Sequence, residues 1–290
     1  MSHIPVLLKE VIKFLDPKPG DIILDATIDG GGHTEAILER ILPDGKLIGI
    51  DQDKQLLDKL NSKNIILLNG NFRDLDKLFK PLKIKLLNGA LYDLGMSSSQ
   101  LEESGRGFTF LKDEPLLMTY KYPLEPEDLT AEKILNNWSE KEIADILFQY
   151  GEESSARRIA KKIAEERKKK RIRTTFELTD IIKKSVPHKF WQRINPATKT
   201  FQALRIAVND ELNAISESLE KVWRFLIPGS RLVIISFHSL EDRIAKNFLR
   251  NKKIEGTAEI KTPKPIRATD EEISYNPRSR SAKLRAAIKI

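Results

Sequence analysis

The chain has 290 residues but no cysteine, which excludes disulfide bonds, thiolate metal sites and cysteine nucleophiles. It also has no apolar run near the roughly 18 residues that a membrane-crossing helix needs. The first ten residues lack the long apolar stretch and the small-residue cleavage site of a secretory signal. We therefore expect a cytoplasmic protein without a membrane partner.

The signature motifs of three common ligand and enzyme classes are missing as well. Without Gly-x-x-x-x-Gly-Lys-Ser/Thr a triphosphate cradle is disfavoured, and without Gly-x-Gly-x-x-Gly a dinucleotide pyrophosphate is disfavoured too. The absence of Gly-x-Ser-x-Gly argues against a Ser-His-Asp hydrolase. A nucleotide-like ligand would therefore have to bind without a phosphate cradle.

Charge, in contrast, is abundant. Charged residues make up 32% of the chain and hydrophobic residues 40%, which is a globular composition. The formal net charge of +8 favours a polyanionic partner. At about 150 residues per domain, the length predicts two structural units.

The segment 22–42 organises the rest of the sequence. An apolar run at Ile22–Leu24 precedes the glycines Gly30–Gly32, and apolar residues then recur at helical spacing from Ala36 to Leu42. This pattern predicts a strand, a glycine loop and a helix. In an open parallel sheet such a loop lies at the carboxyl end of its strand, where a ligand can approach the backbone closely.

Carboxylates near this loop narrow the choice of ligand. Asp25 and Asp29 flank the loop, and Asp51 ends a second apolar run 26 residues after Asp25, the spacing expected for a ribose-binding carboxylate. S-adenosylmethionine has no phosphates and needs acceptors for its ammonium group and ribose hydroxyls. A tight turn with solvated acids is the simpler interpretation, but the place of Asp51 favours a cofactor.

The order of the remaining elements predicts an α/β fold. Strands at 65–69 and 86–94 alternate with helices, which is typical of a doubly wound sheet. Strands do not resume until residue 231, and 201–222 reads as one helix. We therefore expect the sheet domain in two parts, 1–102 and 204–290, with an all-helical insertion at 103–203.

Three side chains lie at or just after the carboxyl ends of predicted strands, where a ligand crevice would lie. Asp93 ends the fourth strand, and Phe72 follows the third, although a phenylalanine is more often a core residue. His238 follows the strand at 231–236, where Ser239 is the expected helix cap. Neither His33 nor His238 has a second ligand at metal-site spacing, so no metal is expected.

Basic residues concentrate in one segment of the predicted insertion. Ten lysines and arginines lie between Arg157 and Arg173, with only Glu165 and Glu166 among them as acids. Such a density can neutralise several phosphates, although a solvated helix face is the plainer interpretation. This segment is our candidate nucleic-acid surface.

Assembled in order, these motifs closely resemble the bacterial 16S ribosomal RNA cytosine-amine methyltransferase family, RsmH, formerly MraW. The resemblance spans nearly the whole chain. It is carried by His3-Ile-Pro-Val-Leu-Leu-Lys-Glu, Gly31-Gly-His-Thr, Gly49-Ile-Asp-Gln-Asp, Tyr92-Asp-Leu-Gly-Met-Ser-Ser-Ser-Gln, Arg106-Gly-Phe-Thr-Phe, Tyr150-Gly-Glu-Glu, Ala197-Thr-Lys-Thr-Phe-Gln-Ala-Leu-Arg-Ile, Ile235-Ser-Phe-His-Ser-Leu-Glu-Asp-Arg and Asn276-Pro-Arg-Ser-Arg-Ser.

The resemblance implies a Rossmann-like methyltransferase domain interrupted by a helical substrate domain. It also implies S-adenosyl-L-methionine as cofactor, and 16S ribosomal RNA or the small ribosomal subunit as partner. Oligomeric state stays open, a homodimer included. The cofactor contacts that the resemblance implies are Gly31, Gly32, His33, Asp51, Phe72, Asp93 and Gln100.

The chain departs from the family pattern at two places. Asp29 stands where the family usually has glycine, which adds a carboxylate close to the cofactor pocket. The family's Gly-Pro-Leu-Asp-Met-Arg-Met-Asp is replaced by Glu114-Pro-Leu-Leu-Met-Thr-Tyr-Lys, which removes an acid at Leu117 and a base at Thr119 together. The loss of both suggests a vanished ion pair, because losing one alone would leave a charge unpaired.

Methyl transfer to a cytosine amine needs an acceptor that localises the amine's lone pair, and Asp93 is the best-placed candidate. A backbone carbonyl is the alternative, since Asp93-Leu-Gly-Met replaces the Asp/Asn-Pro-Pro-Tyr/Phe of many amine methyltransferases. His238 could orient the base or relay the lost proton. Two rival functions remain: a methyltransferase for another nucleic acid, and a non-catalytic RNA-binding or ribosome assembly factor that keeps the cofactor pocket.

Overall fold

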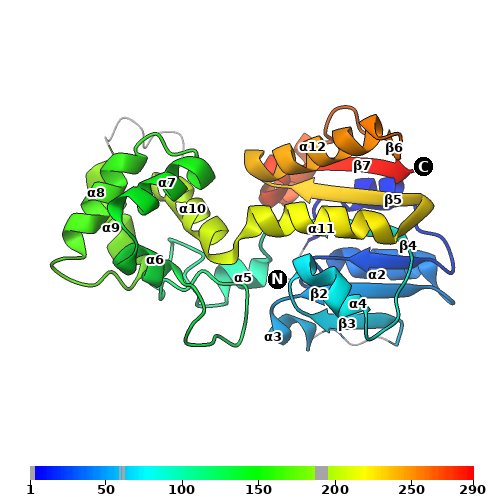
Figure 1. Cartoon of the computed structure of the whole chain (residues 1–290), viewed down its shortest axis with the longest axis horizontal. Coiled ribbons are helices and arrows are strands. Elements are labelled where there is room, and N and C mark those ends of the chain that lie inside the picture. Colours follow the sequence, from blue (N-terminus) through cyan, green and yellow to red (C-terminus); the bar gives the residue numbers. More distant parts are fainter. Residues whose placement is uncertain (1–3, 59, 61–62, 187–194) are drawn as a thin grey trace. The chain divides into compact units, whose positions relative to one another are not determined.

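The chain forms two compact units, which we call the sheet unit and the helical unit. The computed structural model describes residues 4–58, 60, 63–186 and 195–290. The sheet unit comprises residues 1–97 and 212–290, and the helical unit comprises 98–211 (Figure 1). The helical unit thus begins earlier and ends later than the insertion expected at 103–203.

The sheet unit contains a seven-stranded sheet in the order β3-β2-β1-β4-β5-β7-β6 (Figure 1). Strands β1 to β5 run parallel to one another, while β7 runs antiparallel to both β5 and β6. This arrangement confirms the predicted α/β class. The strands are β1 (Ile22–Asp25), β2 (Lys46–Asp51), β3 (Ile65–Asn69), β4 (Leu87–Asp93), β5 (Leu226–Ser236), β6 (Ala258–Ile260) and β7 (Lys283–Lys289).

Alternate residues of the strands pack into two apolar clusters, one on each face of the sheet, because neighbouring strand residues point to opposite sides. In β5, Leu232 and Ile234 join the cluster that contains α4 (Leu75–Phe79), α11 (Glu211–Phe225) and α12 (Ser239–Ile254). Val233 and Ile235 join the cluster that contains α1 (Leu8–Leu15), α2 (Gly32–Ile41) and α3 (Lys54–Leu57). The remaining short helices are η1 (Phe72–Asp74), α13 (Asp270–Tyr275) and η3 (Pro277–Ser281).

The strand order creates a topological switch point beside β1. This strand pairs with β2 on one side and with β4 on the other, so the chain turns to opposite sides of β1 in its two halves. In open α/β sheets a crevice forms at such a point, outside the carboxyl ends of the strands. The residues that end β1, β2 and β4 therefore border the expected ligand crevice.

The helical unit buries its own apolar core. Its helices are α5 (Ser98–Glu102), α6 (Ala131–Asn137), α7 (Glu140–Gly151), α8 (Ala156–Glu166), α9 (Thr175–Ser185) and α10 (Ala197–Asn209). Ser139 and Thr174 begin α7 and α9 with capping boxes, which satisfy the free N–H groups of the first turn. Across the described helices of both units, no stretch has the length and apolar character that a membrane crossing demands.

The prediction of one helix over 201–222 is wrong. Asp210 adopts the left-handed conformation, with φ 47°, and ends α10 there. A new helix, α11, begins at Glu211. The apolar spacing continues across this break, but spacing alone does not reveal a single residue that leaves helical geometry.

Gly151 allows α7 and α10 to approach closely. A Cβ atom at this position would lie 2.6 Å from the main-chain oxygen of Lys199 and 3.3 Å from Ala203 Cβ. Alanine normally stabilises a helix relative to glycine. Here the neighbour is backbone, which cannot move aside as a side chain would.

We therefore expect Gly151→Ala to lower the free energy of unfolding by about 1–3 kcal/mol, the usual cost of overpacking. Urea unfolding checks this value. Gly70→Ala is the control, because its new methyl group would meet only the flexible end of Leu78, at 3.1 Å. Equal unfolding free energies for Gly151→Ala and the wild type would refute the close-packing account.

Candidate active site

Three carboxylates end neighbouring strands at the switch point. Asp25 ends β1, Asp51 ends β2 and Asp93 ends β4. The pairing places Asp25 level with Gly49 and Leu91, so all three acids reach the same edge of the sheet. Their gathering follows from parallel pairing, because parallel strands end at a common edge.

The Asp25 side chain stabilises the glycine loop through hydrogen bonds rather than facing a ligand. Its side chain is 2% exposed, and it accepts hydrogen bonds from Thr27 N at 3.2 Å and from Thr34 Oγ1 at 3.0 Å. Burial raises its pKa to about 6. Both oxygens are thus committed to holding the loop against the first turn of α2.

Gly31 and Gly32 form the sharp entry into α2, as predicted for the glycine loop. Gly31 has φ 81° and is the residue before the helix, a conformation that suits glycine. A Cβ atom on Gly31 would lie 2.8 Å from Leu60 Cδ2, and one on Gly32 would lie 3.1 Å from Pro5 Cδ. The loop is therefore tightly enclosed on its protein side.

His33 lies in the first turn of α2 and is 6% exposed. Its Nε2 is 2.9 Å from the Val6 carbonyl oxygen, which can only accept, so Nε2 carries the hydrogen. Its Nδ1 then presents a lone pair 3.5 Å from Asp93 Oδ2. Burial lowers the pKa of His33, which keeps the ring neutral at pH 7.

Asp93 is the most unusual group at this edge. Its main-chain N–H donates to Thr27 Oγ1 at 2.7 Å, which fixes the residue where β4 ends. Its Oδ1 atom is buried and has no hydrogen-bond partner in the described part of the chain. Burial, and then the Glu241 carboxylate, raises the pKa of Asp93 to about 7. A buried acceptor without a donor indicates a place for a ligand.

Asp29 adds to the negative charge. Burial and then the carboxylates of Asp51 and Asp93 raise the pKa of Asp29 well above its ordinary value. Its backbone is left-handed, with φ 45°, which explains why the family usually has glycine here. Asp51 Oδ1 accepts from Asp53 N at 2.7 Å, which orients the Asp51 side chain.

Phe72 follows β3 at the start of η1 and is half-buried. Its ring meets Tyr92 edge to face, with centroids 5.7 Å apart. Ser218 Oγ donates to the Phe72 carbonyl at 3.0 Å and lies 2.6 Å from Tyr92 Oη. The ring thus packs partly on the core, and its contact with a cofactor stays a prediction.

His238, and not Ser239 as expected, is the N-cap of α12. Its Nε2 lies 3.1 Å from Glu241 Oε1, while Glu241 Oε2 accepts from Phe237 N at 2.8 Å and from His238 N at 3.2 Å. Glu241 is 1% exposed. The carboxylate of Glu241 therefore binds the backbone of His238, while the ring's Nδ1 accepts from Glu241 N at 3.5 Å and its Nε2 makes no hydrogen bond in the described part of the chain.

Gln100 belongs to the helical unit, where it is 4% exposed within α5. Its part in a cofactor site stays a prediction. The residues at 114–121, which differ from the family pattern, also lie in the helical unit and make contacts within it. Glu114 Oε2 accepts a hydrogen bond from Gly107 N at 2.9 Å, and the Tyr120 ring stacks on the Phe108 ring with centroids 5.5 Å apart. Arg106 donates to the carbonyl groups of Thr119 and Tyr120.

Sequence reasoning missed the contacts of two residues that shape this site, Glu241 with His238 and Thr27 with Asp93. Glu241 carries a recognisable signal, since an acid three residues after an N-cap forms a capping box, but the cap was assigned one residue late. Thr27 has no signal, because its contact with Asp93 joins residues 66 positions apart. Local patterns cannot reveal such a partner.

Comparisons with known proteins agree with this geometry. The model of the MraW methylase family matches residues 1–290. Ribosomal RNA small subunit methyltransferase H of Thermotoga neapolitana is 47% identical, over 98% of this chain and 95% of the relative. The proteins of the same name from Deinococcus deserti and Geotalea daltonii are each 43% identical, covering all of this chain and 94% and 99% of the relatives. The chain belongs to the MraW methylase family.

Proposed function

We propose that this protein transfers the methyl group of S-adenosylmethionine to the exocyclic amine of a cytosine in 16S ribosomal RNA. Family membership and the name shared by its relatives support the substrate. The observation that carries the chemistry is the buried, unpartnered Oδ1 of Asp93 at the switch point. We place the reaction in the cytoplasm.

The negative charge at the carboxyl edge of the sheet suits S-adenosylmethionine. S-adenosylmethionine carries a sulfonium and an ammonium group, and the negative charges of Asp51 and Asp93 act on the carboxyl group of Asp29. No lysine or arginine is among the causes that set the pKa of Asp29 or of Asp93. A bound cation would relieve the cost of burying these carboxylates. We assign the ribose to Asp51, the adenine to Phe72, and further contacts to Gly31, Gly32, His33 and Gln100.

The bound cofactor supplies an electrophilic methyl group. The chain's own residues must make the cytosine amine nucleophilic, since its lone pair is delocalised into the ring. Ionised Asp93 would accept a hydrogen bond from the amine and stabilise the positive charge that develops on nitrogen. His238, held by Glu241, would take up the proton that the amine loses.

The helical unit would bind the RNA substrate. Within the basic segment, Lys162, Lys169, Lys170 and Arg171 form ion pairs with glutamates, and Arg167 donates to the carbonyl groups of Leu135 and Trp138. Exposed cations whose side chains make neither an ion pair nor a hydrogen bond in the described residues remain for phosphates, and these are Arg157, Lys161, Lys168 and Arg173.

Two alternative functions predict different results in a methylation assay. A non-catalytic assembly factor would bind S-adenosylmethionine and RNA without turnover. A methyltransferase for another nucleic acid would modify that substrate instead of ribosomal RNA. The name that the relatives share favours methylation of ribosomal RNA, whereas the unpartnered Asp93 oxygen suits cofactor binding and catalysis alike.

Cofactor binding should depend on pH through Asp93, whose pKa of about 7 leaves it partly protonated in the free protein. A cation binds the ionised form better, so affinity for S-adenosylmethionine should rise with pH between about 6 and 7.5, and binding should release protons. Calorimetry in buffers of different ionisation enthalpy measures that release. Asp93→Asn should reduce the proton release to the part that Asp29 contributes, and an unchanged release in this variant would contradict the assignment.

Two substitutions of His238 distinguish its proposed role in catalysis from its role as the N-cap of α12. Asparagine is a good N-cap, whereas alanine loses the cap and should cost about 1 kcal/mol of stability. If His238 relays the proton, both variants should slow single-turnover methyl transfer, while only His238→Ala lowers the urea midpoint. Wild-type turnover in His238→Asn across pH 6–9 would make the residue purely structural.

The unpaired cations of the basic segment should matter more than the paired ones. Replacing Lys161, Lys168 and Arg173 with glutamine should weaken RNA binding and lower the salt slope by about 0.7 for each single-stranded phosphate that is no longer neutralised. The matched control replaces Lys162, Lys169 and Lys170, which already pair with glutamates. Identical slopes for the two triple variants would reduce the segment to a solvated face.

A further inference from the structure

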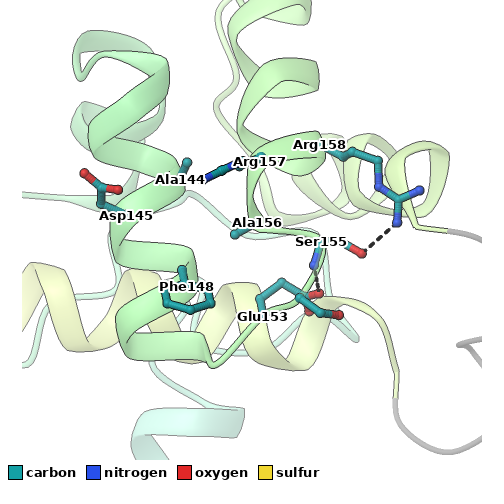
Figure 2. A pocket seen from close by; sticks show the side chains of 9 residues that line it. Ala144, Asp145, Phe148, Glu153, Ser155, Ala156, Arg157 and Arg158 are labelled. Carbon is teal, nitrogen blue, oxygen red and sulfur yellow. Dashed lines mark hydrogen bonds between the residues drawn. The ribbon is translucent and has the colours of Figure 1, made fainter.

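A hollow of about 350 Å³ lies between α7 and the start of α8, wholly within the helical unit (Figure 2). Ligand pockets typically have about 300–1,000 Å³. The residues of this hollow that bear on its chemistry are Asp145, Phe148, Glu153, Ser155, Arg157 and Arg158. No residue assigned to methyl transfer or cofactor binding lines it.

Phe148 is the apolar wall of the hollow. It lies on α7 and is 67% exposed, although its neighbours Ile146 and Leu147 are buried in the core of the unit. An exposed aromatic ring is ordinary by itself. This ring differs because it borders a hollow of about 350 Å³ and lies beside a basic helix.

The two arginines of the hollow have different roles. Arg158 Nη2 donates to Ser155 Oγ at 3.0 Å, so it supports the first turn of α8. Arg157 has no hydrogen bond or ion pair in the described part of the chain, and its side chain extends towards Ala144 of α7 (Figure 2). Arg157 is therefore available to a ligand in or beside the hollow.

The acids of the hollow decide what kind of ligand fits. Glu153 is buried and accepts from Ser155 N at 2.7 Å, so its charge is held inside the protein. Asp145 is exposed at the rim. Two carboxylates disfavour a phosphate within the hollow, but Asp145 can accept from the amine of a base. A flat, uncharged base next to an external phosphate fits this combination.

We propose that the hollow holds one unpaired base of the small-subunit RNA, stacked on Phe148, with Arg157 on the adjoining phosphate. Aromatic stacking beside exposed cations is how proteins bind single-stranded nucleic acid. The proposal rests on the proposed function, and it adds an RNA-binding site outside the methyl-transfer site. Arg157 and the exposed Lys161 continue the positive charge along α8.

The test measures binding of protein-free small-subunit RNA by fluorescence anisotropy. Phe148→Ala should raise Kd by about 5-fold to 150-fold, the loss typical of one stacked base. Phe148→Trp should keep near wild-type affinity, because a larger ring still stacks. Phe176→Ala is the matched control, since Phe176 is also an exposed aromatic of this unit, at 46%, but lines no part of the hollow.

A second arm uses Arg157→Gln, which should weaken binding and reduce the salt slope by about 0.7, the value expected for one neutralised phosphate on a single strand. In methylation assays, Phe148→Ala should raise KM for RNA more than it lowers the single-turnover rate at saturating RNA. Urea midpoints equal to wild type show that each variant is folded, as expected for exposed side chains.

Two results would overturn the proposal: equal Kd values for Phe148→Ala and Phe176→Ala, or a loss in Phe148→Trp as large as that in Phe148→Ala. The binding assay needs no methyl transfer, so it separates the two claims. A wild type that binds RNA through Phe148 but transfers no methyl group would contradict the proposed function alone. A wild type that methylates normally without any Phe148 effect would contradict this inference alone.

Discussion

Burial of carboxylates at one edge of the sheet is the constraint on which the rest of the site depends. Parallel pairing of β1 with β2 and β4 brings their terminal aspartates to that edge, where desolvation opposes ionisation. The protein satisfies Asp25 with Thr27 and Thr34, but it leaves Asp93 Oδ1 without a donor in the described part of the chain. The sheet therefore maintains an unsatisfied acceptor, and we propose that a cationic cofactor and an amine substrate supply the missing partners.

The surrounding structure holds this acceptor in place from three directions. Thr27 fixes the Asp93 backbone, the neutral ring of His33 lies beside Oδ2, and burial and then the Glu241 carboxylate raise the pKa of Asp93. Glu241 also holds His238 at the start of α12. Glu241, Asp93 and the proposed proton relay His238 thus belong to one electrostatic network within the sheet unit. Substitution of any one of them should therefore change the electrostatic environment of the other two.

The sequence predicted the elements whose signals are local. The apolar run at Ile22–Leu24 and the glycines after it located β1, the loop and α2, and counting to strand ends located Asp51 and Asp93. It failed where one residue leaves the pattern, as Asp210 does between α10 and α11, and where a cap shifts by one position, as at His238. Contacts between distant residues, such as Thr27 with Asp93, follow only from the folded topology.

Methyl transfer to the small-subunit RNA is the central claim to test. The most direct measurement incubates the purified protein with S-adenosylmethionine and either small ribosomal subunits or protein-free 16S RNA, then digests the RNA and identifies its nucleosides by mass spectrometry. The account predicts one N4-methylated cytosine per subunit with the wild type and a strongly reduced yield with Asp93→Asn. Saturated cofactor binding with unmodified cytosines in both RNA substrates would contradict it.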